Sequence, residues 1–297
     1  MADRLTMQDP RTQYPQPPFP QQPQEAPGIA SKMDPKPDHG ETSYKGSGKL
    51  AGRKALITGG DSGIGRAAAI AYAREGADVA IVYLPAEESD AKEVVALIEA
   101  EGRKALALPG DVKDESFCRA AVQQTVDAFG GLDVLVVNAG RQQTRPTVAD
   151  ISTDDFDQTM KTNVYALHWF VQATVPHLPV GAAVVTTASV QGYDPSDNLL
   201  DYATTKAAIV AYTKGLAKQL IEKGIRANVV APGPFWTVLQ PSGGQPQEMV
   251  ETFGSKSHFG RPGQPVEIAP VYVLLASQEG SYITGEVYGV TGGAGVA

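Results

Sequence analysis

The chain has 297 residues, 42% of them hydrophobic, and a formal net charge of −8. This length and composition permit a sizeable core in one large domain or two modest ones. The acidic balance argues against nucleic acid as a partner, because phosphate binding requires a basic surface. The single cysteine, Cys118, excludes an internal disulfide framework and a cysteine-cluster metal site, and we expect it to be a small buried hydrophobic residue.

Residues 1 to about 47 differ in composition from the rest of the chain, with nine prolines interleaved with glutamines. Proline at this density excludes a helix or a central strand and favours extended polyproline II chain. Two interpretations remain open: a disordered tail, or an arm that lies over the surface of its own or a neighbouring subunit. Phe19, Ile29 and Met33 are the candidate anchors of such an arm.

The start of the chain is polar and lacks the apolar run of a signal peptide. No stretch approaches the ~18 uninterrupted apolar residues that indicate a membrane span. We therefore expect a cytoplasmic protein with no membrane partner.

The first apolar run, at 54–58, ends in the glycine-rich loop Gly59-Gly60-Asp61-Ser62-Gly63-Ile64-Gly65, and residues 66–74 follow as an alanine-rich helix. A strand, a glycine loop and a helix in this order indicate a phosphate site. Glycine lets the backbone approach a pyrophosphate, and the helix N-terminus offers free N–H groups. Many tight turns also contain glycine clusters, so it is the flanking strand and helix that favour the phosphate site.

The alternation of short apolar runs and helical patterns continues to the C-terminus. Continuous apolar runs between helices are typical of a buried parallel sheet, so the chain predicts an α/β fold with a single Rossmann-type, doubly wound parallel sheet flanked by helices. The predicted strands are 54–58, 78–83, 104–108, 132–137, 182–187, 225–230 and 286–290; the helices include 66–74, 88–101, 114–129, the one that carries Tyr202 and ends near 222, and 265–275.

Five residues follow the ends of predicted strands: Gly59, Asp111, Asn138, Ser189 and Pro232. In doubly wound sheets, ligands bind outside the carboxyl ends of the strands. We therefore expect these residues to converge on one site at one edge of the sheet.

Tyr202 and Lys206 lie one helical turn apart, on the same face of a predicted helix. An ammonium beside a phenol lowers the phenol's pKa from its reference value of ~10, which would let Tyr202 give or take a proton at working pH. The alternative is a solvated helix face without function. The nearby Ser189, whose hydroxyl could hold a substrate oxygen, favours the proton-transfer site.

The stretch 235–260 is rich in Gly, Ser, Pro and Gln, with aromatic residues embedded in it. This composition predicts a mobile substrate lid with apolar anchors, and the alternative is an ordinary surface insertion. The candidates for lining the substrate pocket are Gln191, Tyr193, Phe235 and Trp236.

Residues 48–297 resemble a short-chain dehydrogenase/reductase of the classical type. The proline-rich leader further resembles that of a bacterial subgroup, some of whose members are described as aldehyde reductases or stress proteins. The matching motifs, in the family's order and spacing, are Thr58-Gly59-x-x-x-Gly63-Ile64-Gly65, Asp111, Asn138-Ala139-Gly140, Asn163, Ser189, Tyr202-x-x-x-Lys206 and Pro232-Gly233.

The resemblance implies an NAD(P)-dependent oxidoreductase that interconverts an aldehyde or ketone with an alcohol, acts on a small molecule and forms a homotetramer. Tyr202 would be the general acid or base, and Ser189 would hold the substrate oxygen. Lys206 would lower the Tyr202 pKa and bind the nicotinamide ribose, while Asn163 would position a water that connects Lys206 to solvent.

The resemblance also implies the cofactor contacts. Gly59, Ser62, Gly63, Ile64 and Gly65 would line the pyrophosphate, Asp111 and Val112 the adenine, and Asn138 and Gly140 the adjacent ribose; Ala139, Pro232 and Gly233 belong to the same motifs, and Thr237 matches a threonine that contacts the carboxamide or a phosphate.

The end of the second predicted strand bears on the choice between NAD and NADP. An acidic residue about 20 positions beyond the glycine loop would favour NAD by accepting from the ribose 2′-hydroxyl, but Tyr83 occupies that place. Glu87 or Glu88 could disfavour NADP, whereas Arg66 could favour it. The sequence leaves NAD or NADP open and leans to NAD.

Two functions of other classes compete with this interpretation. A cofactor-binding sensor that has lost catalysis would not need Asn163, Ser189, Tyr202 and Lys206 together. An extended-type epimerase or dehydratase of nucleotide sugars would show a different glycine spacing and a longer substrate domain.

Overall fold

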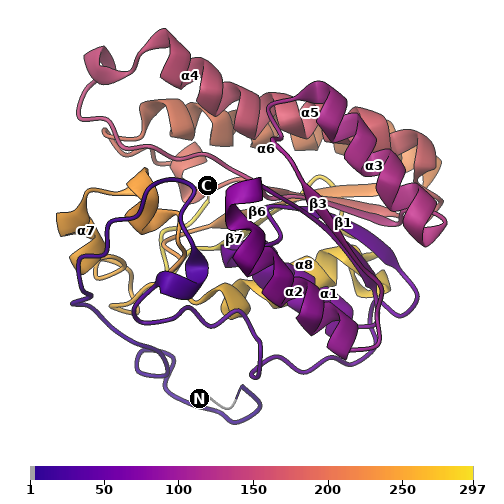
Figure 1. The fold of residues 1–297 in the computed structure, drawn as a ribbon, viewed down its shortest axis with the longest axis horizontal. Coiled ribbons are helices and arrows are strands. Elements are labelled where there is room, and N and C mark those ends of the chain that lie inside the picture. The colour runs from indigo at the N-terminus through magenta and orange to yellow at the C-terminus, as the bar shows by residue number, and fades with distance from the viewer. Residues whose placement is uncertain (1–3, 297) are drawn as a thin grey trace.

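The computed structural model describes residues 4–296. Within them, seven strands form one parallel sheet in the order β3-β2-β1-β4-β5-β6-β7, which confirms the predicted fold (Figure 1). The predicted strand ends lie within two residues of the observed ones. The strands are β1 (Lys54–Thr58), β2 (Asp78–Tyr83), β3 (Ala105–Pro109), β4 (Val134–Val137), β5 (Ala183–Thr187), β6 (Arg226–Pro232) and β7 (Val287–Val290).

Helices cover both faces of the sheet (Figure 1). Successive side chains of a strand point to opposite faces, so Ala55 and Ile57 pack in one buried layer and Leu56 packs in the other. The first layer is covered by α1 (Gly63–Arg74), α2 (Glu88–Ala100) and α8 (Pro265–Ala276), and the second by α3 (Glu115–Phe129), α5 (Ala166–Thr174) and α6 (Leu200–Leu220).

Cys118 of α3 lies in the second of these layers and is fully buried. Burial raises the pKa of its thiol to about 12, so the thiolate form is strongly disfavoured. The prediction that Cys118 is a core residue is confirmed.

The order of the strands creates a crevice beside β1. From β1 the chain adds β2 and β3 on one side, whereas β4 pairs with the other side of β1 and leads on to β5, β6 and β7. At such a switch point the connections leave in opposite directions and the carboxyl ends of the two strands flank an open groove. The groove lies where β1 and β4 end, at Thr58 and Val137.

The 235–260 segment contains a five-residue helix, α7 (Gln247–Glu251), and an irregular turn at Gln240–Gly244. The segment begins against the body of the fold, where Phe235 forms an isolated bridge with Gly263. A second short helix, α4 (Thr153–Met160), continues through a π-helical turn, Lys161–Tyr165, into α5.

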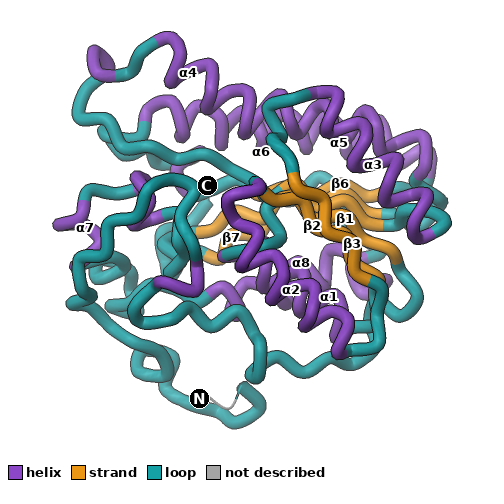
Figure 2. The backbone as a smooth tube through the Cα atoms, in the orientation of Figure 1, coloured by secondary structure: helices purple, strands orange, loops and turns teal. Residues whose placement is uncertain are grey.

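Residues 4–47, called the arm below, lie against the body of their own chain. In Figure 2 the arm is drawn almost entirely as loop; its regular element is a 3-10 helix at Ala30–Lys32. Arg74 of α1 donates to the carbonyl oxygens of Gly40, Glu41 and Tyr44. Each of these contacts joins the arm to a helix of the same chain.

Within residues 4–296, no helix combines the length and the hydropathy needed to cross a lipid bilayer.

Candidate active site

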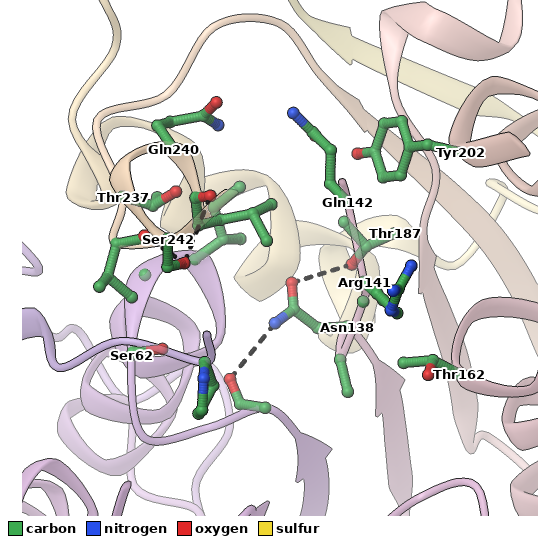
Figure 3. Close-up of a pocket in the computed structure, with 18 of the residues that line it drawn as sticks. Ser62, Asn138, Arg141, Gln142, Thr162, Thr187, Tyr202, Thr237, Gln240 and Ser242 are labelled. Carbon is green, nitrogen blue, oxygen red and sulfur yellow. Dashed lines mark hydrogen bonds between the residues drawn. The ribbon is translucent and has the colours of Figure 1, made fainter. Parts of the chain in front are cut away.

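A cavity of about 510 Å³ lies at the carboxyl end of the sheet. Its wall combines the glycine loop after β1 with the segments that follow β2, β3, β4, β5 and β6, and with residues of the 235–260 segment. In Figure 3, Ser62 lies on one side of the cavity and Tyr202 on the other, with its phenol pointing inward from α6, and Asn138 lies between them.

The glycine loop forms one wall of the cavity, in a backbone conformation that residues with a Cβ could not adopt without strain or overlap. Gly63 has a φ of +51° and is the first residue of α1, and Ser62 before it makes no side-chain cap. The N–H groups at the start of α1 are therefore available to an anion, and Ser62, Gly63 and Ile64 all line the cavity. A Cβ on Gly65 would overlap the carbonyl oxygen of Gly59, so only glycine fits there.

Asn138 ties the end of β4 to the end of β1 at the switch point. The backbone N–H groups of Asn138 and Ala139 both donate to Thr58 Oγ1, at 3.0 Å. The Asn138 side chain donates to the Gly59 carbonyl at 3.3 Å and accepts from Thr187 Oγ1 at 3.3 Å (Figure 3). These bonds fix the groove floor between the glycine loop and β5.

Ser189, Tyr202 and Lys206 meet in the opposite wall of the same cavity. Ser189 follows the end of β5, while Tyr202 and Lys206 lie one turn apart on α6. Lys206 Nζ donates to the Thr187 carbonyl at 2.9 Å and lies 5.2 Å from the centroid of the Tyr202 ring. All three side chains are buried.

Burial governs the ionisation of this pair. It raises the pKa of Tyr202 to about 12, an effect that the hydrogen bond with Ser189 opposes, and it lowers the pKa of Lys206 to about 7. The predicted lowering of the Tyr202 pKa by Lys206 is therefore wrong for this structure. An amine with a pKa of about 7 is neutral at the pH where the phenol ionises, so Lys206 provides no charge to offset the desolvation of the phenolate.

Asn163 lies behind the cavity wall, in the π-helical turn between α4 and α5. Its side chain accepts from the Arg141 N–H at 2.7 Å and donates to the Arg141 carbonyl at 3.0 Å and to Thr205 Oγ1 at 2.9 Å. A Cβ on Gly140 would lie 3.6 Å from both Asn163 Oδ1 and Lys206 Nζ. Asn163 thus links the strand-end loop to α6 beside the lysine.

A protein-family model described as enoyl-(acyl carrier protein) reductase matches residues 59–295. The uncharacterized oxidoreductase YghA of Escherichia coli is 58% identical over 97% of this chain and 98% of its own length. The glucose and ribitol dehydrogenase of Daucus carota is 43% identical over 93% of this chain and 97% of its own length.

Among solved structures, a short-chain dehydrogenase from Burkholderia cenocepacia in complex with NADP matches with a TM-score of 0.77 and 38% identity, over 83% of this chain and 99% of that one. This chain belongs to the short-chain dehydrogenase/reductase family. A 3-ketoacyl-(acyl-carrier-protein) reductase of Brucella melitensis, crystallised with NADH, matches at 29% identity and a TM-score of 0.75 over 82% of this chain and 99% of that one.

This member of the short-chain dehydrogenase/reductase family is an oxidoreductase that uses NAD or NADP. The residues present fit a dinucleotide: an uncapped helix N-terminus, a loop that excludes Cβ atoms, and a groove at the switch point border one cavity. The sequence-predicted residues that line the cavity are Gly59, Ser62, Gly63, Ile64, Tyr83, Asp111, Val112, Asn138, Ala139, Gly140, Ser189, Gln191, Tyr202, Lys206, Pro232, Gly233, Phe235 and Thr237.

Four sequence-predicted residues do not line it: Gly65, Asn163, Tyr193 and Trp236. Gly65 and Asn163 support the wall from behind. The Trp236 side chain is 0% exposed; its ring lies 4.2 Å from that of Phe19 in the arm, and its Nε1 donates to the Pro35 carbonyl at 2.8 Å. The assignment of Trp236 to the substrate pocket is wrong, because the arm covers it.

Two acidic residues in the cavity wall were not predicted to act together. Asp61 of the glycine loop and Glu87 after β2 are both buried, close to Asp90 of α2. Burial raises the pKa of each, and the negative charge of its acidic neighbours raises it further. Asp61 and Glu87 are 26 residues apart in the sequence, so no local pattern predicts that they are neighbours. The pairing of β1 with β2 brings them together.

The other candidates for cofactor selection are already paired. Arg66 binds Glu41 and Glu93 and does not line the cavity, so it is not positioned to favour NADP. Glu88 accepts from the Tyr83 hydroxyl at 2.6 Å. The groups that this chain places at the end of β2 are therefore the Tyr83 hydroxyl and the buried carboxyl groups of Asp61 and Glu87.

Proposed function

We propose that this chain interconverts an aldehyde or ketone with an alcohol, with Tyr202 as the general acid or base. The observation that supports this best is the meeting of Ser189, Tyr202 and Lys206 in the wall of the cavity that also contains the glycine loop. A proton donor and a dinucleotide site in one cavity satisfy the two requirements of carbonyl reduction.

The bound nicotinamide would supply or accept the hydride at the carbonyl carbon. In the reductive direction the Ser189 hydroxyl would donate a hydrogen bond to the substrate oxygen, and Tyr202 would transfer its proton to that oxygen as the C=O double bond is lost. A Tyr202 pKa of about 12 keeps the phenol protonated at neutral pH, which is the form that reduction needs. The same groups would act in reverse in oxidation.

Lys206 and Asn163 would support the proton transfer. A Lys206 pKa of about 7 lets its amine exchange protons near neutral pH, so it can return a proton to Tyr202 after turnover. Its Nζ, held by the Thr187 carbonyl, would also hold the nicotinamide ribose hydroxyls. Asn163 would position the water that connects Lys206 to solvent.

The substrate that we favour is a small hydroxylated carbonyl compound or its alcohol. Gln240 brings an amide to the cavity wall whose oxygen has no hydrogen-bond partner among the described residues, and such an oxygen can accept from a substrate hydroxyl group. The relative from carrot is named for glucose and ribitol, which are compounds of this class. We further expect the cofactor preference to lean to NAD, because the carboxyl groups near Tyr83 would repel a 2′-phosphate, and we expect a cytoplasmic homotetramer.

A substrate panel tests this proposal. Aldehydes, ketones, aldoses and polyols would be mixed with each reduced or oxidised cofactor, and absorbance of the reduced nicotinamide would be followed. We expect turnover with at least one hydroxylated compound. Tight cofactor binding without turnover on the whole panel would instead favour a cofactor-binding sensor.

A further inference from the structure

The arm crosses from the 235–260 segment to α2 over the edge of the cofactor cavity. In Figure 1 it lies, in indigo, between α7 and α2. Ala26 and Pro27, in the middle of this crossing, line the cavity together with the glycine loop. The proline-rich arm therefore borders the same space as the dinucleotide residues.

One end of the crossing is fastened to the 235–260 segment. The Phe19 N–H donates to the Glu251 carbonyl at 2.9 Å, and the Gln24 N–H donates to the Pro241 carbonyl at 3.2 Å. Beneath these bonds lies an apolar cluster formed by Phe19, Ala30, Met33, Trp236, Val238 and Val250. Backbone bonds and apolar burial together hold the arm to this segment.

The other end is fastened to a buried carboxylate. Asp90 of α2 is fully buried and accepts from the Ala30 N–H at 2.6 Å and from the Ser31 N–H at 3.4 Å. A buried carboxylate is costly unless hydrogen bonds satisfy its oxygens. The arm provides those bonds, so its position over α2 is specific.

The arm packs on the 235–260 segment, which in turn packs on the glycine loop. A Cβ on Gly28 would lie 2.6 Å from Val238 Cγ2, so the arm backbone packs directly on this segment. A Cβ on Gly63 would lie 3.2 Å from Thr237 Cγ2, so the residue just before Val238 packs on the glycine loop. Arm, segment and loop form three successive layers.

We propose that Ala26 and Pro27 of the arm are part of the dinucleotide site, and that the docked arm holds residues 237–242 against the glycine loop and so slows release of the cofactor. This inference rests on the use of NAD or NADP and not on the proton chemistry at Tyr202. Coupling between two events is reciprocal. If the arm tightens cofactor binding, cofactor binding must stabilise the docked arm by the same factor.

The Phe19→Ala variant of the full-length chain tests the first half of this coupling. Phe19 is outside the cavity wall, so its loss loosens the arm without removing a cofactor contact. We expect the Kd for NADH or NADPH, measured by fluorescence titration, and the dissociation rate, measured by stopped flow, to rise about tenfold. Phe19→Leu, which keeps an apolar anchor, should recover most of the affinity, and Met7→Ala, at a residue that is 99% exposed, should not change it.

Hydrogen exchange of the unmodified protein tests the second half. Saturating cofactor should slow exchange of the Gln24 and Ala30 N–H groups, which hold the arm at its two ends. A Phe19→Ala variant that binds cofactor within about twofold of the unmodified protein overturns the proposal, since coupling of that size is negligible. Exchange rates at Gln24 and Ala30 that do not change when cofactor is added would also overturn the proposal. This second measurement tests the proposal even if Phe19→Ala fails to fold.

Discussion

The glycine loop and the 235–260 segment line the same cavity, but different forces determine their conformations. The loop is constrained by steric contacts within the β1–α1 unit, because a Cβ on Gly65 would overlap the carbonyl oxygen of Gly59. The side chain of Asn138, at the end of β4, bonds the same carbonyl. The 235–260 segment depends on contacts with an arm some 200 residues earlier, including the 4.2 Å ring contact of Phe19 with Trp236. One region is specified by its neighbours in sequence, and the other by distant packing.

Gly65→Ala should have the largest effect on the loop. Its Cβ would overlap a backbone carbonyl that cannot move without displacing β1, so we expect a loss of about 3 kcal/mol in unfolding free energy, measured in urea, with loss of cofactor binding. Gly215→Ala is the matched control, because within residues 4–296 no atom beyond its own helical turn lies within 4 Å of its Cβ position on α6. That helix substitution should stabilise the protein by about 0.5–1 kcal/mol. A fold and cofactor affinity unaffected by Gly65→Ala would refute the steric account.

Trp236→Ala should have the largest effect on the arm-dependent region. Removing a fully buried tryptophan should cost about 3–5 kcal/mol of unfolding free energy and make the arm sensitive to protease. The measurement is urea denaturation together with limited proteolysis. Tyr282→Ala, at a fully exposed aromatic residue, is the control and should change stability by less than about 0.5 kcal/mol. A similarly small change for Trp236→Ala would mean that the arm does not cover this side chain in solution.

Glu87→Gln probes the place where the loop and the β2–α2 connection meet. Because burial and nearby carboxylates raise the Glu87 pKa, the folded state holds its proton more tightly than the unfolded state does. The contribution of Glu87 to the free energy of unfolding should therefore fall as pH rises from the ordinary carboxyl range through neutrality.

Glutamine has no proton to lose, so the unfolding free energy of the variant should increase relative to that of the unmodified protein as pH rises, by on the order of 2 kcal/mol. Urea denaturation at pH 5 and pH 8.5 measures this gain. Glu222→Gln, on the surface, controls for the change of carboxyl to amide. A stability difference for Glu87→Gln that is the same at both pH values would contradict the buried pair of carboxyl groups.

The difference between the two regions also explains what the sequence could predict. The strand ends, the glycine loop and the pairing of Tyr202 with Lys206 follow from local patterns, and the structure brings them into one cavity. Trp236 was misplaced because its surroundings come from the arm, and a proline-rich composition does not reveal where such an arm docks.

Ionisation depends on burial in the same non-local way. Helical spacing predicts that Lys206 lies beside Tyr202, and it does, with Nζ 5.2 Å from the ring centroid. Spacing does not reveal that both side chains are buried, and it is burial that raises one pKa and lowers the other. The pair Asp61 and Glu87 was missed for a related reason, since only strand pairing brings the two carboxyl groups together.

Comparison of Tyr202→Phe with Tyr193→Phe tests the proton transfer most directly. Tyr202 presents its hydroxyl in the cavity wall, whereas the Tyr193 hydroxyl is buried outside that wall with no hydrogen-bond partner among the described residues. For each variant, the Kd for reduced cofactor and the rate of a single turnover on the best substrate of the panel would be measured. Tyr202→Phe should bind cofactor within about threefold of the unmodified protein while its turnover falls by about 10³-fold or more, and Tyr193→Phe should retain both properties. A Tyr202→Phe variant that turns over at the unmodified rate would contradict the assignment of Tyr202 as the general acid or base.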